Sequence, residues 1–207
     1  MTTTLYFSPG AASFVVHWLL LELDLPHELR RVNLDAREHK TPAYLALNPA
    51  GMVPTLVVDG TPITEAAAIA LQLADGTKLA PPPGPARGAY YQWMLLCANT
   101  LQPAFRAWFY PDEPAGADHA DAAKAKARDK IEATFARFDA QLAAAGPYLL
   151  GASPTAPDFM LTMLMRWSRN MPKPAHTWPA LGALAAVMKA RPTFAELYRR
   201  EGLTEWA

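Results

Sequence analysis

The sequence contains a single cysteine, Cys97, among its 207 residues. One cysteine excludes an internal disulfide and a cysteine-rich metal site, and it fits a reducing cytoplasm. The chain also has no formal net charge, because 19 basic residues balance 19 acidic ones. It therefore lacks the global basic field that favours binding to nucleic acid or to an anionic membrane. An anionic substrate would have to be bound by local groups.

Several motifs of other protein classes are missing. The sequence has no P-loop, no GxGxxG and no spacing of His, Cys and carboxylate residues that suits a metal. Residues 1–8 carry no basic residue, and the apolar run 14–25 is interrupted by His17, Glu22 and Asp24, which makes it too short and too polar for a signal peptide or a membrane span. We expect a cytoplasmic protein with no metal, no covalently bound cofactor, and no nucleic-acid or membrane partner.

The first part of the chain alternates strand and helix patterns. Two β-rich stretches flank an apolar pattern with a period near 3.6, which predicts a βαβ unit with parallel strands. Asp59-Gly60 predicts a hairpin turn. The predicted elements are strands at 3–7, 28–34, 55–58 and 62–64, and helices at 11–23, 41–47 and 65–74.

A proline-rich connector at 79–86 then divides the chain. Everything after it has the pattern of helices, so the sequence predicts an α/β domain at 1–78 and an all-α domain at 87–207. Thr155 and Asp158 have the spacing of a capping box. The predicted helices lie at 88–110, 118–145, 159–167, 178–190 and 194–200.

The stretch around Val53 and Pro54 is the most informative. Pro54 opens a run of β-formers, and a proline beside a glycine turn at a strand start is a candidate for a cis bond. A cis bond would leave the N–H and C=O of Val53 as an open edge for an extended peptide. Glu65 and Ala66 would open a helix, whose N-terminus favours an anion. This combination describes a receptor for a small anionic peptide.

Three motifs carry a resemblance to a known family: LYFSPG at 5–10, NPxGxVPxL at 48–56 and TExxAI at 64–69. They resemble the glutathione transferases, most closely the bacterial beta class, and the resemblance covers essentially the whole chain. It implies a thioredoxin-like β-α-β-α-β-β-α domain followed by a helical bundle, assembled as a homodimer. It also implies that glutathione, as co-substrate, is transferred to a small hydrophobic electrophile.

Two other functions stay open. One is a non-catalytic protein of the same fold that binds glutathione, an apolar ligand or a protein partner. The other is a glutathione-dependent reductase or peroxidase, although a thiol-relay form is disfavoured because no cysteine lies near the first helix.

The resemblance assigns glutathione-binding roles to specific residues. Val53 and Pro54 would pair with the cysteinyl unit through the backbone of Val53. Glu65 would bind the α-amino group, and the backbone N–H of Ala66 would bind the γ-glutamyl carboxylate. The family usually has a hydroxyl residue at position 66, so this anion site is weakened here.

Basic residues of the family often lie just before the second helix. At that point this sequence has Arg37, His39 and Lys40, which would face the glycyl carboxylate of glutathione. A solvated turn is the alternative interpretation.

The group that activates the thiol is not evident from the sequence. The beta-class cysteine is replaced by Ala12, so that position offers only a backbone contact. Tyr6 and Ser13 are the candidate catalytic residues, with Ser8 third, and backbone N–H groups or no activating group as the remaining alternatives. Tyr6 has an equally good interpretation as a packed β-former, and Ser13 as an ordinary N-cap.

Aromatic residues of the second domain are the candidate lining of an apolar cleft for the second substrate. Gln102 replaces the histidine that beta-class proteins carry on the substrate side. His17 and Cys97 are expected to be packed residues without a chemical role. The predicted cleft residues are Phe105, Trp108, Phe109 and Trp167.

Overall fold

The computed structural model describes residues 2–206 and divides the chain into two compact units. The first unit contains residues 2–77 together with residues 189–206, and the second contains residues 78–188. The sequence boundaries of 1–78 and 87–207 instead place the C-terminal residues in the helical domain. Their packing, described below, explains this difference.

The first unit is built on a four-stranded sheet of order β2-β1-β3-β4. β1 is parallel to β2 and antiparallel to β3, and β3 is antiparallel to β4. This arrangement confirms the predicted thioredoxin-like domain. Its elements are β1 (Thr3–Phe7), α1 (Ser13–Glu22), β2 (Glu28–Arg31), the 3-10 turn η1 (Glu38–Lys40), α2 (Pro42–Leu45), β3 (Thr55–Val58), β4 (Thr61–Thr64) and α3 (Ala66–Ala74).

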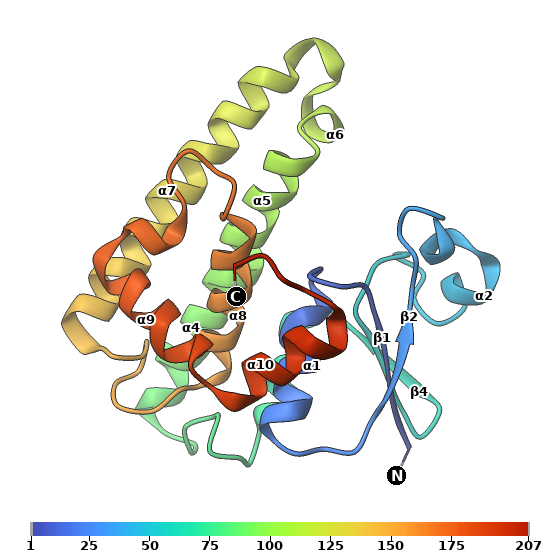
Figure 1. Ribbon diagram of the computed structural model, residues 1–207, viewed down its shortest axis with the longest axis horizontal. Coiled ribbons are helices and arrows are strands. Elements are labelled where there is room, and N and C mark those ends of the chain that lie inside the picture. Colours follow the sequence, from blue (N-terminus) through green and yellow to red (C-terminus); the bar gives the residue numbers. More distant parts are fainter. Residues whose placement is uncertain (1, 207) are drawn as a thin grey trace. The chain divides into compact units, whose positions relative to one another are not determined.

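The side chains of β1 point alternately to the two faces of the sheet, and different helices cover each face. Leu5 and Phe7 are buried on the α1 side, where the Phe7 ring lies 5.8 Å from the ring of His17. Tyr6 points to the other face and packs against a cluster that includes Tyr44 of α2. Figure 1 shows α1 and α10 on one side of the sheet and α2 on the other. The loops that connect these elements form the candidate site.

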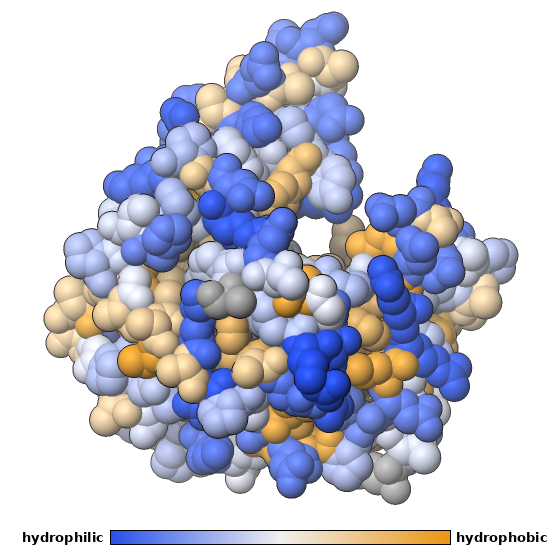
Figure 2. Space-filling model, viewed as in Figure 1, coloured by the Kyte–Doolittle hydropathy of each residue, from blue (hydrophilic) through white to orange (hydrophobic). Residues whose placement is uncertain are grey.

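The C-terminal helix α10 (Pro192–Glu201) joins this unit because its apolar face packs on α1. The ring of Phe194 lies 5.1 Å from Trp18 and 6.3 Å from Phe14. Thr193 accepts a hydrogen bond from Trp18 Nε1 at 3.1 Å. Figure 2 shows strongly hydrophilic residues over the outer face of α10. The helix is therefore amphipathic, with its apolar side turned to α1.

The second unit consists of helices. The sequence predicts one helix at 88–110, whereas the chain forms α4 and α5 joined by a π-helical turn, η2. Pro103 lies just after that turn and lacks the N–H that a regular α-helix would require. The elements are α4 (Pro85–Leu96), η2 (Cys97–Leu101), α5 (Gln102–Phe109), α6 (Asp112–Ala115), η3 (Ala117–His119), α7 (Ala120–Ala145), α8 (Ala156–Trp167), η4 (Ala175–Thr177) and α9 (Pro179–Lys189).

Aromatic contacts fill the core of the helical unit. Phe105 of α5 contacts Phe135 of α7 at 6.1 Å, and Trp93 of α4 contacts Phe138 at 5.4 Å. Cys97 is fully buried, and burial raises the pKa of its thiol well above the usual value. Cys97 is thus a core residue, as the sequence predicts, and its thiol stays protonated.

The capping box of α8 forms as predicted. Asp158 is fully buried and accepts hydrogen bonds from the backbone N–H groups of Leu149 and Thr155, and from the hydroxyl of Thr155, each at 2.8 Å. Burial outweighs these donors and raises the pKa of Asp158 from 3.8 to about 6.

We expect Asp158 to make the protein less stable as the pH rises from about 4 to about 6. Because the folded pKa is above the unfolded one, the native state binds more protons than the unfolded state in this window. The difference between these two pKa values corresponds to roughly 3 kcal/mol of unfolding free energy. Urea unfolding of the wild type and of Asp158→Asn, at pH 4.5 and pH 7, tests this. An identical pH dependence in the two proteins would contradict it.

Candidate functional site

The loop before β3 presents Val53 as an open backbone edge. The Val53–Pro54 bond is cis, as the sequence suggests. Within residues 2–206, neither the N–H nor the C=O of Val53 has a hydrogen-bond partner. The flanking Met52 carbonyl is held by the Tyr44 hydroxyl at 2.6 Å and by Asn48 Nδ2 at 2.8 Å. Val53 thus lies in a loop that is fixed from within the fold and can pair with an extended ligand.

Lys40 supports the same loop from η1. Its Nζ donates to the carbonyls of Gly51 at 3.0 Å and Ala50 at 3.4 Å. A Cβ on Gly51, which has φ +59°, would lie 2.8 Å from Lys40 Nζ and from the His39 carbonyl, so this close approach requires glycine. The predicted carboxylate-binding residues His39 and Lys40 are therefore brought beside the loop that carries Val53.

Glu65 lies between β4 and α3 in an uncommon backbone conformation. Its φ of 69° and ψ of 109° are rare for a residue with a side chain, and its side chain is exposed. Within the described chain, the N–H groups of Ala66, Ala67 and Ala68 have no partner, because no side chain caps α3. Glu65 therefore presents a carboxylate beside three free amides, which suits a ligand that carries both an ammonium and a carboxylate.

The start of α1 offers a second set of amides. Ser13 is fully buried, and its hydroxyl donates to the Ser8 carbonyl and accepts from the Ser8 N–H, both at 3.1 Å. This reciprocal pair occupies the hydroxyl that the sequence offers as a thiol-activating group. In the part of the chain that the structure describes, the backbone N–H groups of Ala12 and Ser13 have no partner.

Tyr6 belongs to the packing around Val53. Its ring lies 5.9 Å from the ring of Tyr44, and its hydroxyl accepts from Arg30 Nη1 at 3.4 Å. Tyr6 and Ala11 both pack on the cluster that contains Val53. The structure thus brings the Val53 loop, the start of α1 and Tyr6 together, with the tyrosine hydroxyl directed at Arg30.

A buried hydrogen bond between α1 and α10 is absent from the sequence prediction. His17 of α1 and Glu201 of α10 are both buried, with Nδ1 and Oε1 2.9 Å apart. Glu201 Oε2 also accepts from the N–H of Gly10 at 2.7 Å, in the loop that leads into α1. Sequence patterns gave no signal for this contact, because it joins residues nearly 200 positions apart.

The predicted cleft residues form an aromatic cluster in the helical unit. Phe105 is fully buried, and Phe109, 47% exposed, is stacked on it at 6.0 Å. The ring of Trp167 meets both of these rings edge-on, at 5.8 and 6.2 Å. Trp108 faces another way, beneath the ammonium of Lys124 at 4.7 Å. Phe109 is thus the exposed surface of this cluster, and Phe105 supports it from the core.

Among residues 2–206, no group of three or more His, Cys, Asp or Glu side chains is arranged to hold a metal ion. No helix in that range is both long enough and apolar enough to cross a membrane.

The chain matches two models of known protein families. The family model of the glutathione S-transferase N-terminal domain matches residues 11–75, and the family model of the C-terminal domain matches residues 121–200. Glutathione S-transferase GST-4.5 of Xanthomonas campestris pv. campestris is 33% identical over 96% of this chain and 98% of its own length.

Solved structures agree with these matches. A glutathione transferase homologue from Sulfitobacter, with bound glutathione, has a TM-score of 0.89 at 25% identity and covers 98% of this chain and 99% of that chain. A bacterial beta class glutathione S-transferase from Sphingomonas chungbukensis has a TM-score of 0.82 at 27% identity, with coverages of 97% and 100%.

Proposed function

Since the chain belongs to the glutathione S-transferase family, we propose that it binds glutathione on its first unit and transfers the thiolate to a small hydrophobic electrophile. The open backbone edge of Val53 carries this proposal. An extended tripeptide needs paired main-chain donors and acceptors at its centre, and Val53 offers one of each.

The two ends of glutathione meet groups of opposite charge. The α-amino group binds the exposed Glu65 carboxylate, and the γ-glutamyl carboxylate binds the free N–H of Ala66 at the start of α3. The glycyl carboxylate lies toward His39 and Lys40. Because Lys40 Nζ already donates to two carbonyls, it adds positive charge at this end from a fixed position.

The free amides of Ala12 and Ser13 activate the thiol. A thiol with a pKa near 8.5 is mostly protonated at pH 7, and the thiolate is the nucleophile. Hydrogen bonds from these amides, together with the helix dipole of α1, stabilise the thiolate. The hydroxyl of Ser13 donates to Ser8, so Ser13 acts by holding the loop. The hydroxyl of Tyr6 accepts from Arg30 and keeps its own proton, which leaves Tyr6 as the side-chain alternative for donating to the thiolate.

The chemical step is then nucleophilic attack. The thiolate sulfur forms a bond to the electrophilic atom, and the leaving group departs with the bonding electrons or, in an addition, the product takes a proton from water. Phe109 is the exposed member of the aromatic cluster in the helical unit and stays the candidate contact for an apolar ligand of that unit.

A binding protein without turnover is the second candidate function. It is favoured by the alanines at positions 12 and 66, where the family carries a cysteine and a hydroxyl residue, and by the committed hydroxyl of Ser13. Such a protein would bind glutathione at Val53 and Glu65 without lowering the pKa of its thiol.

Titration of bound glutathione separates these candidates. We expect the thiol pKa, followed by thiolate absorbance in the ultraviolet, to lie well below that of free glutathione. Ala12→Pro removes one amide at a position whose φ of −62° suits proline, and should raise the thiol pKa. Ala12→Gly keeps the amide, adds no side-chain donor and is the matched control. Ser13→Ala and Tyr6→Phe test the two side chains directly.

Each outcome of the titration has a definite meaning. Binding with an unshifted thiol pKa would exclude the transferase mechanism and leave the binding protein. A thiol pKa that rises in Ser13→Ala or Tyr6→Phe, but not in Ala12→Pro, would assign activation to a side chain. An absence of binding would show that the family fold is retained without its ligand.

We also propose that the protein is a homodimer. Tyr91 and Leu95, 43% and 49% exposed, lie one turn apart on α4 and form an exposed apolar pair. Sedimentation velocity at micromolar concentration measures the assembly state, and a monomer across that range would contradict the proposal.

A further inference from the structure

Met52 differs from the other sulfur-containing residues of the chain in its exposure. It is 51% exposed, and it directly precedes Val53 in the loop that presents the open backbone edge. Within residues 2–206, every other methionine and the cysteine are buried, at 5% exposure or less. Met52 therefore carries the sulfur atom most accessible to a dissolved oxidant in this part of the chain. The buried sulfur residues are Met94, Cys97, Met160, Met163, Met165, Met171 and Met188.

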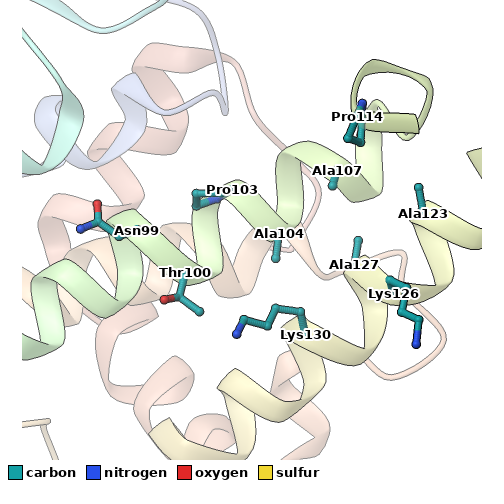
Figure 3. Close-up of a pocket in the computed structure, with 10 residues that line it drawn as sticks. All are labelled: Asn99, Thr100, Pro103, Ala104, Ala107, Pro114, Ala123, Lys126, Ala127 and Lys130. Atoms are coloured by element: carbon teal, nitrogen blue, oxygen red, sulfur yellow. The ribbon is translucent and has the colours of Figure 1, made fainter. Parts of the chain in front are cut away.

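The groove on the surface of the second unit does not expose a second sulfur atom. It lies between α5 and α7, and Figure 3 labels the ten residues that line it. None of these ten residues is methionine or cysteine. An oxidant that enters this groove thus contacts only carbon, nitrogen and oxygen atoms.

The backbone around Met52 is fixed by hydrogen bonds from side chains. The Met52 carbonyl accepts from the Tyr44 hydroxyl at 2.6 Å and from Asn48 Nδ2 at 2.8 Å. The carbonyl of Gly51, the preceding residue, accepts from Lys40 Nζ at 3.0 Å. The loop is therefore held on both sides of the Met52 side chain, which keeps the thioether at the surface beside the open backbone edge.

Met52 lies between two parts of the proposed glutathione site. The residue before it, Gly51, contacts Lys40, toward which the glycyl carboxylate is proposed to lie. The residue after it is Val53, the proposed partner of the cysteinyl unit. A thioether at this point is apolar and polarisable, so it can cover the glycyl end of the ligand without competing for the hydrogen bonds of its carboxylate.

We propose that Met52 is an oxidation site through which hydroperoxides lower the affinity of the protein for glutathione; this inference rests on the proposed function. The thioether sulfur attacks one oxygen of hydrogen peroxide, an S–O bond forms and the O–O bond breaks. The proton of the transferred oxygen passes to the leaving hydroxide, so the sulfur is oxidised to a sulfoxide and the peroxide is reduced to water.

The sulfoxide changes the chemistry of this part of the site. Oxidation converts a flexible apolar side chain into a polar one. The new oxygen accepts hydrogen bonds and donates none, so beside the glycyl carboxylate it places one acceptor against another. Glutathione consequently binds less tightly until a methionine sulfoxide reductase, supplied with a thiol reductant, removes the oxygen.

Hydrogen peroxide treatment of the full-length protein, followed by removal of the peroxide, tests the proposal. Peptide mass spectrometry shows which residue gains oxygen, because the tryptic peptide 41–78 contains Met52 as its only sulfur residue. We expect this peptide to be oxidised before those of the buried methionines. Calorimetric titration should then give an affinity for glutathione about threefold to tenfold lower than before treatment, the range expected for one hydrogen bond. Methionine sulfoxide reductases with dithiothreitol should restore the affinity.

Met52→Leu and Met171→Leu are the matched variants, because leucine is apolar, similar in volume to methionine and free of sulfur. Each protein is compared with itself before and after peroxide. The affinity of Met52→Leu should not change on treatment, whereas that of Met171→Leu should fall as in the wild type. Oxidation of Met171 before Met52, an unchanged affinity of the wild type with Met52 oxidised, or an equal loss in Met52→Leu would overturn the proposal.

Failure of this proposal is separable from failure of the proposed function. A wild-type protein that does not bind glutathione before treatment would overturn the proposed function and, with it, the effect of oxidation on affinity. Tight binding before treatment that persists after full oxidation of Met52 would overturn the oxidation proposal alone. The order in which the methionines are oxidised is read from the mass spectrum independently of glutathione.

Discussion

Glu65→Gln is expected to weaken glutathione binding about tenfold to a hundredfold. The exposed Glu65 carboxylate is the proposed partner of the glutathione α-amino group. Glutamine has nearly the same shape but no charge, and hydrogen bonds to charged groups contribute roughly 1.5–3 kcal/mol. Isothermal titration with glutathione at pH 7 measures the change.

Glu28→Gln is the control for this prediction. Glu28 is exposed on β2, an edge strand of the same sheet, and has no proposed contact with glutathione. An affinity loss in Glu65→Gln no larger than in Glu28→Gln would contradict the assigned role of Glu65.

Glu65→Gly separates the backbone of this residue from its side chain. A residue held at φ 69° and ψ 109° stores strain of about 1–3 kcal/mol, which glycine relieves. We therefore expect Glu65→Gly to lose glutathione binding while its resistance to urea is equal to or greater than that of the wild type. A ligand-binding role explains why the chain has glutamate, and not glycine, at this strained position. A Glu65→Gly protein less stable than the wild type would contradict strain at this site.

Local sequence signals predicted much of the fold in both units. The Val53-Pro54 pair, the Asp59-Gly60 turn and the capping box of Thr155 and Asp158 each depend on residues a few positions apart, and the structure has all three. The parallel pairing of β1 with β2 follows from the βαβ rule, and the antiparallel pairing of β3 with β4 follows from the Asp59-Gly60 turn. Such features can be predicted because the interacting groups are neighbours in the chain.

Other features depend on contacts that no local pattern contains. The sequence offers the Ser13 hydroxyl as a donor to a ligand, but only the structure shows that the backbone of Ser8 already occupies it. The π-helical turn before Pro103 interrupts a helix whose apolar period looks continuous. The α10 helix was assigned to the helical domain by order along the chain, whereas Phe194 and Glu201 attach it to α1.

Glu201 on α10 contacts His17 and Gly10 in the interior of the first unit. Glu201→Ala should destabilise the protein by about 3–5 kcal/mol. The substitution leaves His17 Nδ1 and the Gly10 N–H, now at 2.9 and 2.7 Å from the carboxylate, without their acceptor in a buried region. Each buried donor that loses its acceptor costs roughly 1–3 kcal/mol, so two of them account for about this much. Against a typical total of about 5–15 kcal/mol, such a loss is readily measured by urea unfolding.

Two other variants show whether the loss comes from the buried carboxylate. Glu201→Gln keeps one acceptor oxygen and should fall between Glu201→Ala and the wild type. Glu196→Gln removes a carboxylate from the exposed face of the same helix, where it pairs with Arg199 and Arg200, and should change stability little. If Glu201→Ala and Glu196→Gln unfold at the same urea concentration, the buried contact does not hold α10 on α1. If Glu201→Ala is destabilised as expected, its remaining folded protein should also bind glutathione less tightly, because Gly10 lies in the loop that positions the amides of Ala12 and Ser13.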